Sequence, residues 1–226
     1  MKTGDATRVL RTLGWSIHRD ETGDKGATYA LPDRIVRIVY GIRPLPQTAQ
    51  FEAVFSLSTP AFSAACLTID PEGSAYAPLV AASKGYRDRA PDIVEHHIRQ
   101  ASDAVLAWAE AQDLDQALRA RADLPSSAPG AAPIWHLAAL ALRGDLDRLN
   151  RYQASFEAGD RLGFVPYITR DHIDRAVLLA RRSERTPEQA LRGAGRAGPG
   201  GLCAALSRLR TALGQRAKVR RPGRDT

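Results

Sequence analysis

The hydrophobic pattern of this chain changes its period near residue 90, and this change restricts the fold class. Between residues 15 and 80, apolar residues alternate with small or polar ones, as in residues 51–58, which read FEAVFSLS. After residue 90, apolar residues recur at spacings of three and four. The first pattern is typical of half-buried strands and the second of amphipathic helices. A run of strands followed by a run of helices predicts an α+β domain, in which a helical layer packs on a sheet.

Residues 1–80 are predicted to form one helix and an antiparallel β-meander. The helix covers residues 5–13 and ends before Gly14. Short turns such as residues 20–26, rich in Asp and Gly, leave no room for the long crossovers that parallel strands need. Four to five strands are expected, at residues 15–18, 29–31, 34–42, 51–58 and 62–69.

Residues 90–182 are predicted to be helical. The expected helices cover residues 91–111, 114–122, 134–142, 146–158 and 170–182. Gly144 followed by Asp145 marks the end of one helix and the N-cap of the next, which predicts a helical hairpin. His136 lies among apolar residues and is interpreted as a core histidine with its hydrogen bonds satisfied. His172, in a first helical turn, is interpreted as a capping residue.

The positive charge of the chain lies in its last segment. The net charge is +7, yet residues 1–182 hold 22 basic and 22 acidic residues. We therefore predict one neutral α+β domain over residues 1–182 and a basic, partly disordered tail over residues 183–226, rich in Gly, Ala and Arg. A stripe of leucines predicts a short helix within the tail: Leu202, Leu206, Leu209 and Leu213.

The basic tail suggests a binding surface for phosphate backbones or for an acidic partner. Its candidate binding residues are Arg208, Arg210, Arg216, Lys218, Arg220 and Arg221. Blocks of like charge are also found in solvated extensions without a dedicated role, so this alternative stays open.

The sequence contains no nucleophile elbow, P-loop or Cys-x-x-Cys motif. The nearest approach to a metal or proton-transfer cluster is Asp92 with His96 and His97. Adjacent helical residues project about 100° apart, so only one of the two histidines can join Asp92, and a catalytic zinc usually has three protein ligands. Cys66 lies among apolar residues, which indicates an inert buried thiol. We predict no catalytic residue, no cofactor and no metal.

Cysteine usage and the N-terminal segment bear on the compartment. Two cysteines, Cys66 and Cys203, do not make a disulfide framework, and the first residues are charged where a signal peptide is apolar. No stretch approaches the ~20 apolar residues of a membrane span. Arg outnumbers Lys 28 to 4, a bias typical of GC-rich and mostly bacterial genomes. We therefore expect a bacterial, cytoplasmic protein.

Three hypotheses for function follow. The first is a non-enzymatic protein-binding module, resembling immunity proteins that neutralise a toxin or chaperones that hold a secreted effector. Its interface is expected at a sheet edge or between sheet and helices, with four aromatic residues as candidates: Trp15, Tyr40, Phe164 and Tyr167. The second is a nucleic-acid-associated protein that binds through its tail. The third is an enzyme with an unrecognised site.

Overall fold

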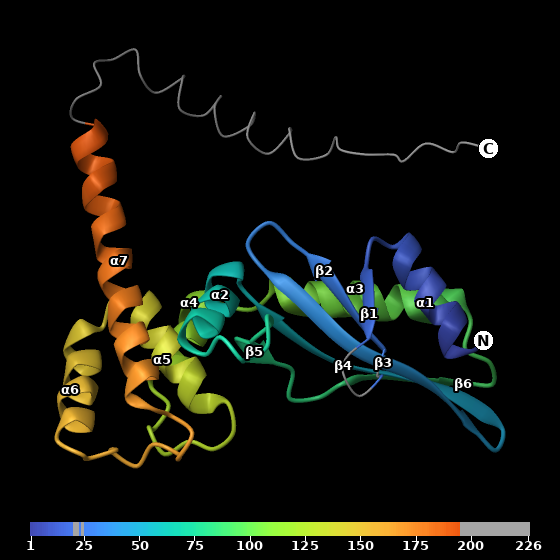
Figure 1. Cartoon of the computed structure of the whole chain (residues 1–226). Helices are drawn as coiled ribbons and strands as arrows, with labels where there is room; N and C mark the ends of the chain where they lie inside the picture. The colour runs from blue at the N-terminus through green and yellow to red at the C-terminus, as the bar shows by residue number, and fades with distance from the viewer. Residues whose placement is uncertain (20–22, 24, 195–226) are drawn as a thin grey trace, which may run out of the picture. The chain divides into compact units, whose positions relative to one another are not determined.

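A computed structural model describes residues 1–19, 23 and 25–194, and it confirms the predicted α+β fold (Figure 1). The first half of the chain forms α1 (Thr3–Thr12), β1 (Ser16–Arg19), β2 (Lys25–Ala30), β3 (Ile35–Leu45), β4 (Thr48–Ser58), α2 (Pro60–Ile69), β5 (Val80–Ala81) and β6 (Tyr86–Ala90). The second half forms α3 (Glu95–Glu110), α4 (Leu114–Ala122), α5 (Ala132–Leu142), α6 (Leu146–Glu157) and α7 (Arg170–Ala194). The chain divides into two units, Met1–Arg181 and Arg182–Thr226.

The six strands form one antiparallel sheet in the order β1-β2-β3-β4-β5, and β6 also pairs with β4. In the long β3–β4 ladder, Ile38 lies opposite Phe55 and Tyr40 lies opposite Ala53. Since side chains alternate between the two faces of a strand, this register gathers the apolar residues of both strands on one face. We call this the inner face and the opposite one the outer face.

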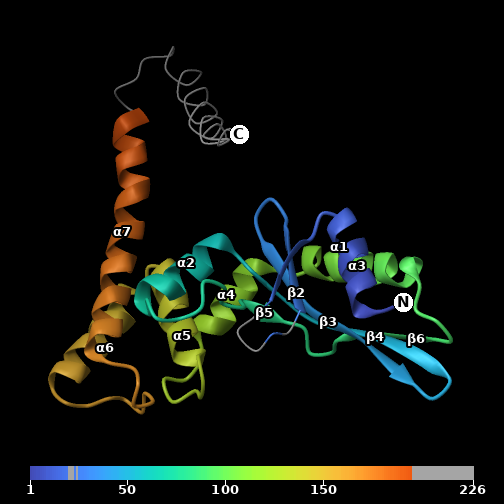
Figure 2. The ribbon, with the colours of Figure 1, turned by 45° about the vertical axis from the view of Figure 1, so that its right-hand side comes forward.

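Helices α1 and α3 lie together on the inner face of the sheet, as Figures 1 and 2 show. Their apolar residues and those of the strands form a sheet core. Its members include Ala6, Val9, Leu10, Trp15, Val36, Ile38, Phe51, Ile98, Ala101 and Val105. In this core the Nε1 atom of Trp15 donates a hydrogen bond of 2.9 Å to Ser102 Oγ on α3, so the only polar atom of that indole is satisfied.

A second, helical core joins α2 with the C-terminal helices. Its larger members are Phe62, Ile69, Leu137, Leu140, Leu149, Phe164, Ile168, Ile173 and Val177. The predicted hairpin is confirmed in α5 and α6, where Asp145 caps α6 by accepting a 3.1 Å hydrogen bond from the backbone N–H of Arg148. The predicted helix over residues 114–122 is α4.

The strand predicted at residues 62–69 is wrong, because this segment is helix α2. Thr59 caps the helix, its side chain accepting a 3.0 Å hydrogen bond from the backbone N–H of Phe62, and Pro60 occupies the first turn. Phe62, Cys66 and Ile69 are all buried, which is the spacing of one helical face. The Thr-Pro start signal outweighs the ambiguous apolar run.

One further strand and two helix boundaries differ from the prediction. The charged segment YRDRA, residues 86–90, forms β6, and the following helix α3 begins at Glu95 instead of residue 91. Val94, directly before α3, has an extended backbone, and its neighbour Ile93 is fully buried. The last helix does not end at residue 182: the backbone of α7 continues to Ala194. The leucine stripe predicted to form a helix lies outside the described residues.

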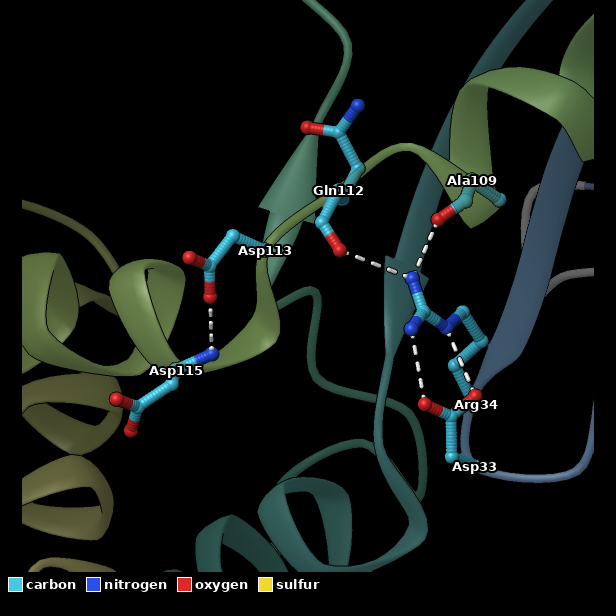
Figure 3. A network of polar contacts seen from close by, with 6 residues as sticks. All are labelled: Asp33, Arg34, Ala109, Gln112, Asp113 and Asp115. Atoms are coloured by element: carbon cyan, nitrogen blue, oxygen red, sulfur yellow. Dashed lines mark hydrogen bonds and ion pairs between the residues drawn. The ribbon is translucent and has the colours of Figure 1, made fainter.

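Arg34, in the turn between β2 and β3, ties the sheet to the segment that enters the helical core (Figure 3). Its Nη1 atom donates to the carbonyl oxygens of Ala109 at 2.6 Å and Gln112 at 3.1 Å, at the C-terminal end of α3. Its Nε and Nη2 atoms donate to the carboxylate of Asp33. This carboxylate raises the pKa of Arg34 above its usual value. A single side chain therefore caps α3 and holds the start of the α3–α4 connection.

Replacing Arg34 with methionine is expected to lower the free energy of unfolding by about 2 kcal/mol. The carbonyl groups would lose hydrogen bonds from a charged donor, each worth about 1.5–3 kcal/mol. Helix α3 would also lose a positive charge at its C-terminal end, where a cation is favourable. Urea denaturation followed by circular dichroism measures the change. Arg99→Met is the control, because Arg99 is exposed and pairs only with Glu95 one turn earlier on α3; it is expected to shift stability by less than about 0.5 kcal/mol. Equal effects of the two substitutions contradict the capping role of Arg34.

Candidate functional site

The outer face of the sheet carries polar and apolar side chains in adjacent rows. On β3 and β4, Arg37 lies opposite Ser56, and Val39 lies opposite Val54. Val54 is 62% exposed, the largest exposure among the large hydrophobic residues of the described chain. This arrangement follows from the alternation of side chains along a strand. The sequence neighbours of Arg37 and Val39, such as Val36 and Ile38, point to the opposite face and fill the sheet core. A single exposed valine is common on protein surfaces, but Val54 and Val39 lie opposite each other and line the same groove.

A shallow groove of about 330 Å3 runs over this face. The strands supply Arg37, Val39, Val54 and Ser56, while Tyr76 and Pro78 come from the segment between α2 and β5. The side chains of this groove alternate between apolar and hydrogen-bonding groups. Such a lining suits a polypeptide segment better than a purely apolar ligand.

Arg37, Tyr76 and Ser56 form a contact cluster at the side of the groove. The guanidinium carbon of Arg37 lies 5.3 Å from the centre of the Tyr76 ring, which is within the range of a cation–π contact. The hydroxyl groups of Tyr76 and Ser56 lie 2.9 Å apart and share a hydrogen bond. Burial raises the pKa of Tyr76 to about 12, so its hydroxyl stays protonated at neutral pH. The tyrosine is therefore a neutral platform for the arginine.

The guanidinium of Arg37 has unused hydrogen-bonding capacity. In the part of the chain that the structure describes, Arg37 forms no ion pair with a carboxylate, and its Nε atom is enclosed without a hydrogen-bond partner. Enclosed polar atoms without a partner are rare in folded proteins and cost free energy. An acceptor from outside would reach the guanidinium through its Nη atoms, which are not enclosed in this way.

The outer face is basic, although residues 1–182 are neutral as a whole. Across β3, β4 and β6 it carries Arg37, Arg43, Arg87 and Arg89 against one carboxylate, Glu52. Glu52 lies directly opposite Arg87, and its carboxylate is 3.9 Å from the guanidinium of Arg43. One carboxylate cannot neutralise the arginines around it. This face therefore attracts negatively charged partners.

The four aromatic residues predicted for the interface lie in different environments. Trp15 is 2% exposed, Tyr40 6% and Phe164 4%, and all three pack inside the cores. Only Tyr167 lies at the surface, 45% exposed, where its hydroxyl donates a 2.7 Å hydrogen bond to the carbonyl oxygen of Gly130. Trp15, Tyr40 and Phe164 thus serve the fold, and the side chains of the groove come from other positions.

Three of those positions, Arg37, Val54 and Tyr76, were not predicted from the sequence as site residues. The signal that could have found them is the alternation within residues 35–43, IVRIVYGIR, where arginines fall on the face opposite Val36, Ile38 and Tyr40. The six basic tail residues predicted to bind, Arg208, Arg210, Arg216, Lys218, Arg220 and Arg221, lie outside the described residues.

The histidines do not build a metal or proton-transfer site in the described chain. Asp92 precedes α3, so it does not occupy the helical turn before His96 that the sequence predicted. The Nδ1 atom of His97 accepts a 3.1 Å hydrogen bond from the backbone N–H of Val94 and so caps α3. Among the residues that the structure describes, no group of three potential metal ligands is found.

Two further histidines, His136 and His172, have the structural roles that the sequence predicted. His136 is fully buried, and its ring nitrogens lie 3.1 Å from the Tyr152 hydroxyl and 3.3 Å from the Arg121 carbonyl oxygen. Burial lowers its pKa, which favours the neutral ring. His172 caps α7, its Nδ1 atom accepting a 3.1 Å hydrogen bond from the backbone N–H of Thr169.

A second hollow, of about 360 Å3, lies in the helical part of the molecule. It is lined by residues of α2, α5 and the segments that follow α2 and precede α7, among them Cys66, Asp70, Trp135 and Tyr167. Burial raises the pKa of the Cys66 thiol to about 12, so the thiolate needed for nucleophilic chemistry does not form at neutral pH. Cys66 is the inert thiol that the sequence predicted.

No helix within residues 1–19 and 25–194 is both long and apolar enough to span a membrane. Comparison with known proteins gives one match. A family model described as "Family of unknown function (DUF6990)" matches residues 2–181, which contain both cores and the outer face. No curated protein and no solved structure matches the chain significantly.

Proposed function

Because the chain belongs to this family of unknown function, we propose its function from its surface: it is a non-enzymatic protein-binding module whose partner docks on the outer face of the sheet. The observation that carries the proposal is Val54, an exposed valine in the centre of a sheet face, beside a groove that contains an unpaired arginine. Helices α1 and α3 cover the inner face only, which leaves the outer face for a partner.

The module is of the kind of an immunity protein or a secretion chaperone, and its partner is accordingly a toxin or a secreted effector. Both kinds of module bind a single protein tightly without turning it over, and both use a rigid scaffold with a complementary surface. We place the protein in the cytoplasm of a bacterium, where a free thiol such as that of Cys66 stays reduced. The basic tail is an accessory in this proposal, since it adds positive charge that speeds encounter with an acidic partner.

The proposal is tested by affinity capture from native lysate, with and without nuclease, using the full chain and its Val54→Glu variant. A glutamate at position 54 buries a charge in the contact, so the amount of the captured partner is expected to fall by about tenfold or more. Leu178→Glu is the matched control, because Leu178 is 53% exposed on α7, and it is expected to retain the partner.

Circular dichroism establishes that both variants stay folded. Equal capture of the partner by Val54→Glu and by the wild-type chain contradicts the proposed interface. If nuclease releases the captured material, the chain is instead a nucleic-acid-associated protein. Capture of no stoichiometric partner by any form of the chain contradicts a protein-binding function.

A further inference from the structure

Resting on the proposed function, we infer that Arg37 is an anchor for a carboxylate, and that the segment docked on the outer face is an extended acidic peptide of the partner. Three features of the outer face support such a partner: an arginine without a carboxylate, an apolar floor beside it in the groove, and further arginines toward β6.

The first feature is the state of Arg37. Its guanidinium is held over the ring of Tyr76, and Tyr76 is itself fixed by the hydrogen bond of its hydroxyl group to Ser56. The arginine is therefore oriented before any ligand arrives. Guanidinium groups bind carboxylates through two parallel hydrogen bonds, and such a ligand would supply acceptors to a group that has no carboxylate partner among the described residues.

The second feature is the apolar floor next to Arg37. Val39 and Val54 face each other across β3 and β4, one row away from Arg37 and Ser56. In an extended peptide, residues two apart point to the same face. A segment with an acidic residue and an apolar residue two positions apart would place a carboxylate on Arg37 and a side chain on Val54.

The third feature is the set of further arginines on the outer face. Arg43, Arg87 and Arg89 extend the positive charge of the outer face toward β6, with Glu52 as the one carboxylate among them. Complementary charge selects an acidic partner. The tail, residues 183–226, has ten basic and three acidic residues, so it carries the same sign as this face and is excluded as its occupant. A second copy of the basic face is excluded for the same reason.

Nucleic acid fits this groove less well than an acidic peptide. Proteins that hold single strands offer aromatic rings on which bases stack. In this groove Tyr76 has Arg37 over its ring, and the valines of the floor offer no hydrogen bonds to phosphate. A peptide uses the apolar floor and the arginine together.

The test uses a short fluorescein-labelled peptide of repeated Glu-Ser-Val-Ser, which places Glu and Val on one face of an extended chain. Its binding to the full-length protein is measured by fluorescence anisotropy and compared with a Lys-Ser-Val-Ser peptide and a single-stranded oligonucleotide. We expect the glutamate peptide to bind more tightly than either. We expect Arg37→Gln to raise its Kd about tenfold, equivalent to about 1.4 kcal/mol.

Arg99→Gln is the control, since it removes the same charge from the exposed arginine of α3, and it is expected to change the Kd less than twofold. A second readout is the nuclear magnetic resonance signal of the Arg37 Nε–H group, which is expected to move during titration with the glutamate peptide. An equal loss of affinity in both variants, or none in either, overturns the anchor role of Arg37. Tighter binding of the oligonucleotide, with loss on Arg37→Gln, overturns the acidic peptide.

The two proposals fail in different ways. Val54→Glu tests whether the outer face binds a protein at all, whereas Arg37→Gln tests the acidic character of the segment that it holds. If the captured partner is lost with Val54→Glu but is retained with Arg37→Gln, the protein-binding function stands and the carboxylate anchor does not.

Discussion

Replacing Trp15 with alanine is expected to lower the free energy of unfolding by about 3–5 kcal/mol, the range for aromatic residues removed from a core. The indole is 2% exposed and packs between α1, the sheet and α3. Its loss leaves a cavity and also leaves the hydroxyl of Ser102, itself buried, without the donor that now lies at 2.9 Å. Small domains have total stabilities of about 5–15 kcal/mol, so this substitution removes a large part of the total. Urea denaturation measures it.

Trp15→Phe separates the two contributions. Phenylalanine fills most of the volume but cannot donate to Ser102, and the expected cost is about 1–3 kcal/mol. An alanine variant as stable as the wild-type chain would contradict the packing of Trp15. It would also revive the expectation from sequence that this residue belongs to an exposed interface.

Replacing Phe164 with alanine is expected to cost a similar amount, about 3–5 kcal/mol, in the other core. Its ring lies 5.3 Å from that of Tyr152 and 5.7 Å from that of Phe156, and the three form an aromatic cluster beside the buried His136. Phe164→Leu keeps most of the apolar volume and is expected to cost less than about 1.5 kcal/mol. Tyr167→Ala, close in sequence but 45% exposed, is the surface control, with an expected cost of about 1 kcal/mol.

Hydrogen exchange read by mass spectrometry shows how the two cores respond. If the sheet core and the helical core unfold together, Phe164→Ala will accelerate exchange in the protected amides of β3 and β4 as well as in α5. If exchange rises in the helices while the sheet stays protected, the cores are separate cooperative units. A Phe164→Ala variant with unchanged stability would contradict the burial of the aromatic cluster.

The sequence predicts this fold wherever one local pattern decides the structure. The alternation in residues 34–42 and 51–58 identifies β3 and β4, and the Gly144-Asp145 pair identifies the hairpin of α5 and α6. The pattern fails at residues 62–69, because a short apolar run suits a buried strand or a buried helix equally. It also misses β6, whose charged residues form a strand because β4 offers them backbone partners along Ala49–Ala53.

The candidate site depends on contacts that no local pattern contains. The pairing of Arg37 with Ser56 follows from the β3–β4 register, and Tyr76 reaches both from a loop after α2. The aromatic residues chosen from the sequence illustrate the same limit. Trp15 directly precedes the short strand β1, and the sequence around it does not show that Ser102, on a helix much later in the chain, accepts its hydrogen bond.

The junction at Arg34 has a consequence for how this family can diverge. The hydrogen bonds of Arg34 to the end of α3 and the segment after it go to the main-chain oxygens of Ala109 and Gln112, and every amino acid provides a main-chain oxygen. The amino acids at positions 109 and 112 can therefore change among homologues, as far as packing in the sheet core allows, without loss of these hydrogen bonds. Position 34 is different, because lysine lacks the planar fork that serves two carbonyls and a carboxylate at once. Homologous sequences are expected to vary more at 112 than at 34.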